Sequence, residues 1–133
     1  MKTLSLIIKR EFFDKILSGE KKTETREIRP KTAGRYIYYE NLDNGQKYAP
    51  KDIDNAPESE KGYSYGAIQY DAIQLYVGYA KNRPGALVEV KGSEIYQLTD
   101  EDGQPIIYES EGNEYYLTQI EYTLGKVLSK TNC

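Results

Sequence analysis

The fold is decided near the N-terminus, in the stretch from Leu4 to Pro30, which reads LSLIIKREFFDKILSGEKKTETREIRP. Its opening residues place an apolar side chain at every second position, and this period predicts a half-buried β-strand. The spacing then changes to pairs of apolar residues four positions apart. This change predicts a helix over roughly Arg10–Ser18, with one apolar face made of Phe12, Phe13, Ile16 and Leu17.

The end of that helix is predicted at Gly19, because glycine adopts the left-handed conformation of a helix C-terminus without strain. A second strand is predicted over Thr23–Ile28, where Pro30 stops it. Alternate residues of a strand point to the same side, so Glu24 and Arg26 are expected on one face. The chain therefore opens with a strand, a helix and a second strand.

The middle of the chain is less regular. Between Pro30 and about Tyr70 turn-forming residues dominate, and the pattern predicts one short strand at Arg35–Tyr39. So long an irregular segment indicates a functional loop or an insertion, here a Tyr-rich one at about residues 30–65. Its tyrosines are expected either to form a lid over a site or to pack the insertion, and they are Tyr36, Tyr38, Tyr39, Tyr63 and Tyr65.

Apolar alternation resumes after Tyr70 and predicts further strands as far as Leu128. About six short strands with one N-terminal helix predict a mostly β protein with α (α+β). A small β-barrel with the helix beside it is the expected architecture, because closure would remove exposed strand edges. No repeat or linker is visible, so residues 1–133 are expected to form a single domain.

The amino-acid composition excludes several kinds of catalytic and metal-binding site. The chain has 133 residues, no histidine and a single cysteine, Cys133. These counts exclude Ser–His and Cys–His catalysis, an internal disulfide framework and a Cys-rich metal site.

The N-terminal residues lack the basic and long apolar segments of a signal peptide, and no apolar run in the sequence is long enough for a membrane helix. A cytoplasmic location is therefore expected, with no membrane partner.

Charge is unevenly distributed along the sequence, although the net charge is −3. Residues 1–40 contain ten Lys/Arg and six Asp/Glu, whereas residues 41–133 contain eight and fifteen. An acidic protein is not a general nucleic-acid binder, since phosphate neutralisation dominates such binding. The excess of Lys/Arg in residues 1–40 is still compatible with one local anion-binding site there.

The motif G-x-K-x-x-E-x-R lies directly after the predicted helix, with Gly19, Lys21, Glu24 and Arg26 at its four fixed positions. A strand, a helix ending in Ser-Gly and this motif together resemble an ASCH domain, a family of the PUA-like superfamily. Further blocks resemble the family in the same order, so that the likeness covers most of the chain outside residues 30–65. These blocks are Tyr70–Ile73 with Gly78–Pro84, Val88–Gly92 with Glu94 and Ile95, and Ile120–Leu128. The chain is most similar to small stand-alone ASCH proteins of bacteria and phages.

The resemblance implies a PUA-like β-barrel with a cleft beside the first helix, where the family is proposed to bind RNA or nucleotides. Lys21 or Arg26 would hold a phosphate or a base carbonyl, and Glu24 would accept a hydrogen bond from an exocyclic amine. Tyr79 would offer a face on which a base stacks. The expected nucleic-acid-binding set is completed by Lys22 and Arg83.

Some of these residues also have a purely structural interpretation. A solvated strand face with weak ion pairs accounts for Lys22 at least as well, and a solvated turn accounts equally for the loop that contains Arg83. The acidic stretch Asp100–Glu114 lacks the spacing of a calcium loop, so a solvated hairpin is expected there. Neither a metal nor a cofactor is expected.

A binding module for RNA or a modified nucleotide is the leading interpretation, and the sequence favours it over an enzyme. Some small ASCH-like proteins are amidohydrolases that act on an acylated nucleoside with a lysine, a threonine nucleophile and a glutamate. This chain keeps the lysine as Lys21 but has Glu24 where that group has its threonine, and Thr23 and Thr25 are expected on the opposite face. A protein partner that binds the Tyr-rich segment, for a factor of phage origin, is a third possibility. A monomer or weak dimer is expected.

Overall fold

A computed structural model describes all residues, 1–133, and it is mostly β, as the sequence predicts. The helical elements are α1 (Arg10–Leu17) and two 3₁₀ turns, η1 (Ala33–Arg35) and η2 (Pro50–Asn55). None of them combines the length and the apolar character needed to cross a bilayer. The strands are β1 (Thr3–Ile8), β2 (Thr23–Ile28), β3 (Ile37–Asn41), β4 (Lys47–Tyr48), β5 (Tyr63–Ala67), β6 (Ala72–Val77), β7 (Gly85–Gln97), β8 (Ile107–Ser110), β9 (Asn113–Tyr116) and β10 (Thr118–Thr131).

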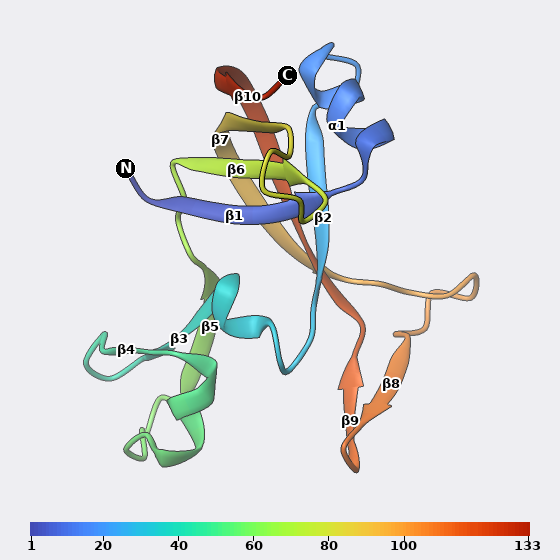
Figure 1. The fold of residues 1–133 in the computed structure, drawn as a ribbon. Coiled ribbons are helices and arrows are strands. Elements are labelled where there is room, and N and C mark those ends of the chain that lie inside the picture. The colour runs from blue at the N-terminus through green and yellow to red at the C-terminus, as the bar shows by residue number, and fades with distance from the viewer. The chain divides into compact units, whose positions relative to one another are not determined.

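The chain divides into two compact units. Unit 1 comprises residues 1–25, 69–94 and 121–133, and unit 2 comprises residues 26–68 and 95–120. A five-stranded sheet has the order β1-β6-β7-β10-β2 (Figure 1), with β1 parallel to β6 and β6 antiparallel to β7. In this order β1 and β2 are the two edges of the sheet, and closure into the expected PUA-like barrel stays a prediction.

The core of unit 1 is apolar and forms where the sequence places its alternating residues. Helix α1 is amphipathic, and it buries Phe13 and Ile16. The other buried side chains of this core come from the strands and are Leu4, Leu6, Ile8, Ala72, Ile73, Leu75, Ala86, Val88, Tyr122 and Leu124. Helix α1 ends as predicted, because Gly19 has a φ of +82°, a conformation that glycine adopts without steric cost.

Unit 2 contains a three-stranded antiparallel sheet of order β4-β3-β5. The sequence predicted one short strand in this region, and the structure adds two more with two 3₁₀ turns between and before them. Cross-strand register places Tyr39 opposite both Tyr48 and Tyr65, so aromatic pairs hold the sheet together. Tyr36, which directly precedes β3, is buried, and this favours packing rather than a lid for this residue.

The acidic stretch forms the expected hairpin. Strands β8 and β9 are antiparallel, with Tyr108 opposite Tyr115. Glu111 and Gly112, between the strands, both have positive φ, as the tightest hairpin turns require. Glu111 pairs with Lys31 across 3.5 Å on the surface. The hairpin therefore presents carboxylates to solvent.

Candidate functional site

Lys21 and Glu24 meet just beyond the C-terminal end of α1. The Lys21 ammonium donates to the Thr23 carbonyl oxygen, and its Nζ lies 3.9 Å from Glu24 Oε1. The backbone N–H of Thr25 donates to the same Glu24 oxygen at 3.1 Å. Glu24 is only 7% exposed, whereas 24% of the Lys21 side chain reaches solvent. A fixed carboxylate therefore stands beside a cation that remains accessible.

Two other cations of the expected site lie close in sequence. Lys22 is exposed, and its carbonyl oxygen accepts a hydrogen bond from the Leu124 N–H of β10. Arg26 is half-buried on β2 and belongs to unit 2, whereas Lys21 and Glu24 belong to unit 1. The backbone thus fixes the start of β2 against β10, while the Lys22 side chain points into solvent.

The loop between β6 and β7 carries the remaining two expected residues. Tyr79 is 84% exposed, so its ring has an accessible face. The Arg83 guanidinium lies over the Tyr76 ring at 3.9 Å from the centroid, and it donates to the Gly78 carbonyl oxygen at 3.3 Å. Arg83 is therefore a fixed part of the loop, whereas Tyr79 is its exposed aromatic residue.

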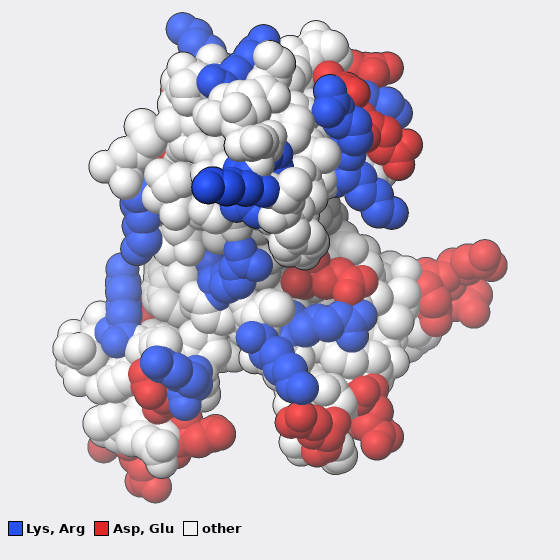
Figure 2. All heavy atoms as spheres, in the orientation of Figure 1, with Lys and Arg blue, Asp and Glu red and all other residues white.

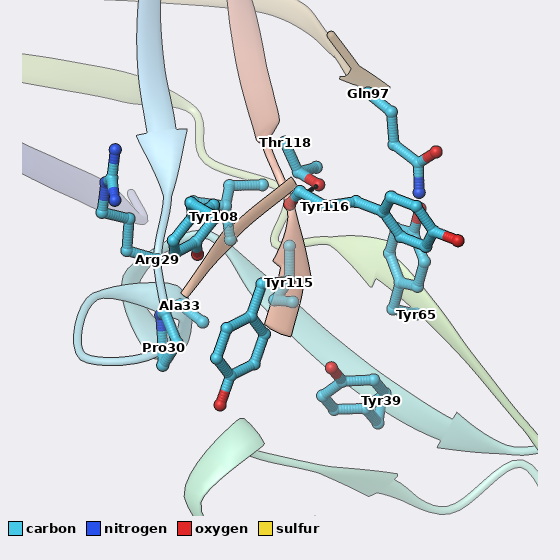
Figure 3. Close-up of a pocket in the computed structure, with 12 residues that line it drawn as sticks. Arg29, Pro30, Ala33, Tyr39, Tyr65, Gln97, Tyr108, Tyr115, Tyr116 and Thr118 are labelled. Carbon is cyan, nitrogen blue, oxygen red and sulfur yellow. Dashed lines mark hydrogen bonds between the residues drawn. The ribbon is translucent and has the colours of Figure 1, made fainter. Parts of the chain in front are cut away.

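Unit 2 contains a pocket of about 220 Å³ that the sequence did not predict. Figure 3 shows its lining, in which five tyrosine rings from the strands β3, β5, β8 and β9 surround the space. The tyrosines are Tyr39, Tyr65, Tyr108, Tyr115 and Tyr116. Of these only Tyr39 and Tyr65 belong to the Tyr-rich segment, and the other three come from β8 and β9.

An aromatic stack forms one wall of this pocket. The rings of Tyr108 and Tyr115 are stacked, with centroids 5.6 Å apart and planes 27° apart. The Arg29 guanidinium lies over Tyr108 at 4.6 Å from the ring centroid, and Arg29 Nη2 also pairs with Glu27 at 2.8 Å. A cation on a tyrosine face is thus already part of the wall.

Two further cavities share lining residues with this pocket. A cavity of about 290 Å³ shares Tyr115 and Tyr116 with it, and one of about 750 Å³ shares Pro30, Ala33, Tyr39 and Tyr115. Tyr115 lines all three cavities, which we together call the tyrosine groove. A carboxylate lines each of the two flanking cavities, namely Glu114 in the smaller and Asp54 in the larger.

The groove changes the acidity of two of its tyrosines. Burial, followed by Tyr65 and Asp54, raises the pKa of Tyr39 above its ordinary value of 10.0. Burial also raises the pKa of Tyr108, although the Arg29 cation opposes that change. Because both hydroxyls keep their protons at neutral pH, both rings present neutral faces to a ligand.

The sequence contained a partial signal for this groove. Fourteen of the 133 residues are tyrosines, which is a large number, and Tyr115 and Tyr116 lie on the strand that follows the hairpin turn at Glu111 and Gly112. Their position beside Tyr39 and Tyr65 depends on how two separate small sheets from distant parts of the chain pack together, and periodicity cannot show that.

Comparisons of the chain with protein-family models, with curated proteins and with solved structures find no match. The resemblance to ASCH domains therefore stands on the motif residues alone.

Proposed function

We propose that the chain binds RNA or a modified nucleotide through Lys21, Glu24 and Arg26, as an ASCH-like protein with a PUA-like barrel. The observation that carries the proposal is the placement of Glu24. Acidic side chains are rarely buried without a reason, and this one is buried beside a lysine at the end of α1. The order β1-α1-β2, with Gly19 of the motif ending the helix, also supports it.

Charge supports the same site. Unit 1 contains 11 Lys/Arg and 8 Asp/Glu, a net charge of +3, although the whole chain is at −3. A phosphate is attracted to such a surface, and the accessible Lys21 ammonium makes a charge-assisted hydrogen bond to it. The Glu24 carboxylate only accepts hydrogen bonds, so it favours bases with an exocyclic amine. Tyr79 adds an exposed ring for stacking.

The amidohydrolase alternative has less support. That chemistry needs a threonine hydroxyl beside the lysine, and here Glu24 is the residue beside Lys21. The burial pattern of β2 alternates around Glu24, with Thr23 and Thr25 less buried than it is. We therefore propose a binding module rather than an enzyme.

Fluorescence anisotropy with labelled single-stranded oligouridylate and oligoadenylate tests the proposal, with cytidine and acetylcytidine monophosphates as competitors. We expect binding at low salt that weakens as salt is added. Lys21→Ala and Arg26→Ala should each weaken binding by about tenfold, the loss of one charge-assisted contact. Lys15→Ala is the matched control, since it removes one exposed charge from the last turn of α1.

Two results would overturn the proposal. One is the absence of binding to every probe at low salt. The other is an equal loss of affinity in Lys15→Ala and Lys21→Ala, which would mean that net charge alone is responsible.

A further inference from the structure

The tyrosine groove lies in the more acidic half of the molecule. Unit 2 contains 7 Lys/Arg and 13 Asp/Glu, a net charge of −6. Residues 95–120 alone hold six acidic residues and no basic one. Figure 2 shows acidic side chains gathered over the loop that follows β7 and over the tip of the β8–β9 hairpin. A polyanion is repelled by this unit, and a cation is attracted to it.

The lining of the groove suits a cation that is also planar. Tyrosine faces carry negative potential and attract ammonium and guanidinium groups, and a guanidinium can in addition stack flat on the ring. Arg29 on Tyr108 demonstrates this contact within the groove itself. Glu27 compensates the Arg29 charge at 2.8 Å, so that this cation is not a barrier to a second one.

The other charges along the groove favour the same ligand. Asp54 and Glu114 line the two flanking cavities. Two lysines, Lys31 and Lys51, also line the largest cavity, but Lys31 is paired with Glu111 at 3.5 Å. The lining itself contains three cations and two carboxylates, but Arg29 and Lys31 are paired with Glu27 and Glu111. With these two partners counted, four carboxylates face three cations, which agrees in sign with the net charge of the whole unit.

The size of the groove indicates a peptide rather than a single small cation. The central pocket of about 220 Å³ has the volume of roughly seven water molecules at about 30 Å³ each. Cavities of about 290 and 750 Å³ adjoin it at Tyr115. Successive side chains of an extended segment could occupy neighbouring cavities, and Tyr115 would separate them.

We propose that the tyrosine groove binds an arginine-containing peptide segment of a partner protein, with guanidinium groups stacked on the tyrosine rings and paired with the carboxylates nearby. This site is separate from the Lys21 and Glu24 site and takes a ligand of opposite charge. The Tyr-rich segment then contributes Tyr39 and Tyr65 to an interface, while β8 and β9 contribute the remaining rings.

A fluorescein-labelled peptide of alternating glycine and arginine tests the proposal with the full-length chain. A glycine-lysine peptide of the same length keeps the charge but has no planar guanidinium, so it tests the contribution of stacking. A glycine-glutamine peptide of the same length has no side-chain charge, so it tests the contribution of the backbone. We expect the arginine peptide to bind, the lysine peptide to bind about fivefold more weakly, and the glutamine peptide to show no binding.

Variants of Tyr115 locate the site. Tyr115→Ala should weaken arginine-peptide binding by about tenfold, whereas Tyr115→Phe, which keeps the ring, should stay within about twofold of the unchanged chain. Tyr79→Ala and Lys21→Ala, both in unit 1, should leave peptide binding unchanged. Circular dichroism and urea unfolding show whether Tyr115→Ala is folded, and Tyr115→Leu serves as the second variant if it is not.

Several outcomes would overturn the proposal. Equal affinity for the arginine and lysine peptides would reduce the groove to a charged surface. Unchanged peptide binding in folded Tyr115→Ala or Tyr115→Leu would place the site elsewhere. Oligouridylate binding that depends on Tyr115 would make the groove a nucleic-acid site. Loss of RNA binding in Lys21→Ala concerns only the site around Lys21 and Glu24, so the two proposals fail independently.

Discussion

At the scale of single residues, Glu24 has the most demanding environment in unit 1. Its carboxylate is buried, accepts the Thr25 N–H and lies 3.9 Å from the Lys21 ammonium. A carboxylate in such a place needs both the cation and the hydrogen bond to offset its desolvation. The motif spacing puts both partners within four residues, so their meeting depends only on the local path of the chain from α1 into β2.

Glu24→Gln separates the charge of this residue from its shape. We expect the variant to fold and to keep its affinity for phosphate-bearing ligands, because Lys21 and Arg26 are unchanged. Discrimination among bases should fall, since an amide donates as well as accepts, whereas a carboxylate only accepts. Affinities for adenosine, cytidine and uridine monophosphates, measured by calorimetry, check this. Preserved discrimination among the three bases would show that Glu24 has a structural role only.

At the scale of elements, local patterns were sufficient for the first strand, the helix and the second strand. The apolar period of 2, the change to a helical period and Gly19 are all features of neighbouring residues, and the structure follows them closely. The Lys21 and Glu24 pair found in the structure depends on the same local path of the chain.

The local sequence pattern predicted only one strand of the three-stranded sheet of unit 2, and this has a physical reason. Its strands are only two to five residues long, and the residues between them are turn formers with no apolar period. The sheet is held by partners distant in the chain, such as Tyr39 with Tyr65. The tyrosine groove depends on this pairing and on the packing of the separate β8–β9 hairpin, and a local pattern shows neither of them.

This sheet should lose stability in alkaline solution. The pKa of Tyr39 is raised in the folded protein, so the folded chain holds that proton more tightly than the unfolded chain does. The associated stabilisation is complete below the ordinary pKa of 10.0 and is lost as the pH rises through the raised value. Tyr39→Phe removes the titrating group while keeping the ring, so its free energy of unfolding should fall less steeply.

Urea unfolding at several values between about pH 9 and pH 11, which bracket tyrosine ionisation, measures this slope. Tyr79→Phe is the matched control, because it removes a hydroxyl from a ring that is 84% exposed. We expect the control to follow the unchanged chain. An identical slope for Tyr39→Phe and Tyr79→Phe would contradict the role given to Tyr39.

At the scale of the whole molecule, the net charge of −3 conceals two opposite parts, +3 in unit 1 and −6 in unit 2. Lys21 and Glu24 lie in the positive part and the tyrosine groove in the negative part, and each proposed ligand carries the complementary charge. The field of the complete molecule acts on both ligands as they approach, since the Debye length is about 30 Å at 0.01 M salt. A change in net charge should therefore affect the two association rates in opposite directions.

The loop at residues 100–102 allows this to be tested without altering either site. Replacing Asp100, Glu101 and Asp102 by Asn, Gln and Asn raises the net charge from −3 to 0. Asn at position 100 retains the oxygen that accepts from the N–H groups of residues 102 and 104, so the turn should be preserved. Stopped-flow measurements at about 0.01 M salt should show faster oligouridylate association and slower arginine-peptide association. Both differences should vanish near 1 M salt, where the Debye length is about 3 Å. A change of both rates in the same direction would mean that the field of the complete molecule does not govern the two association rates.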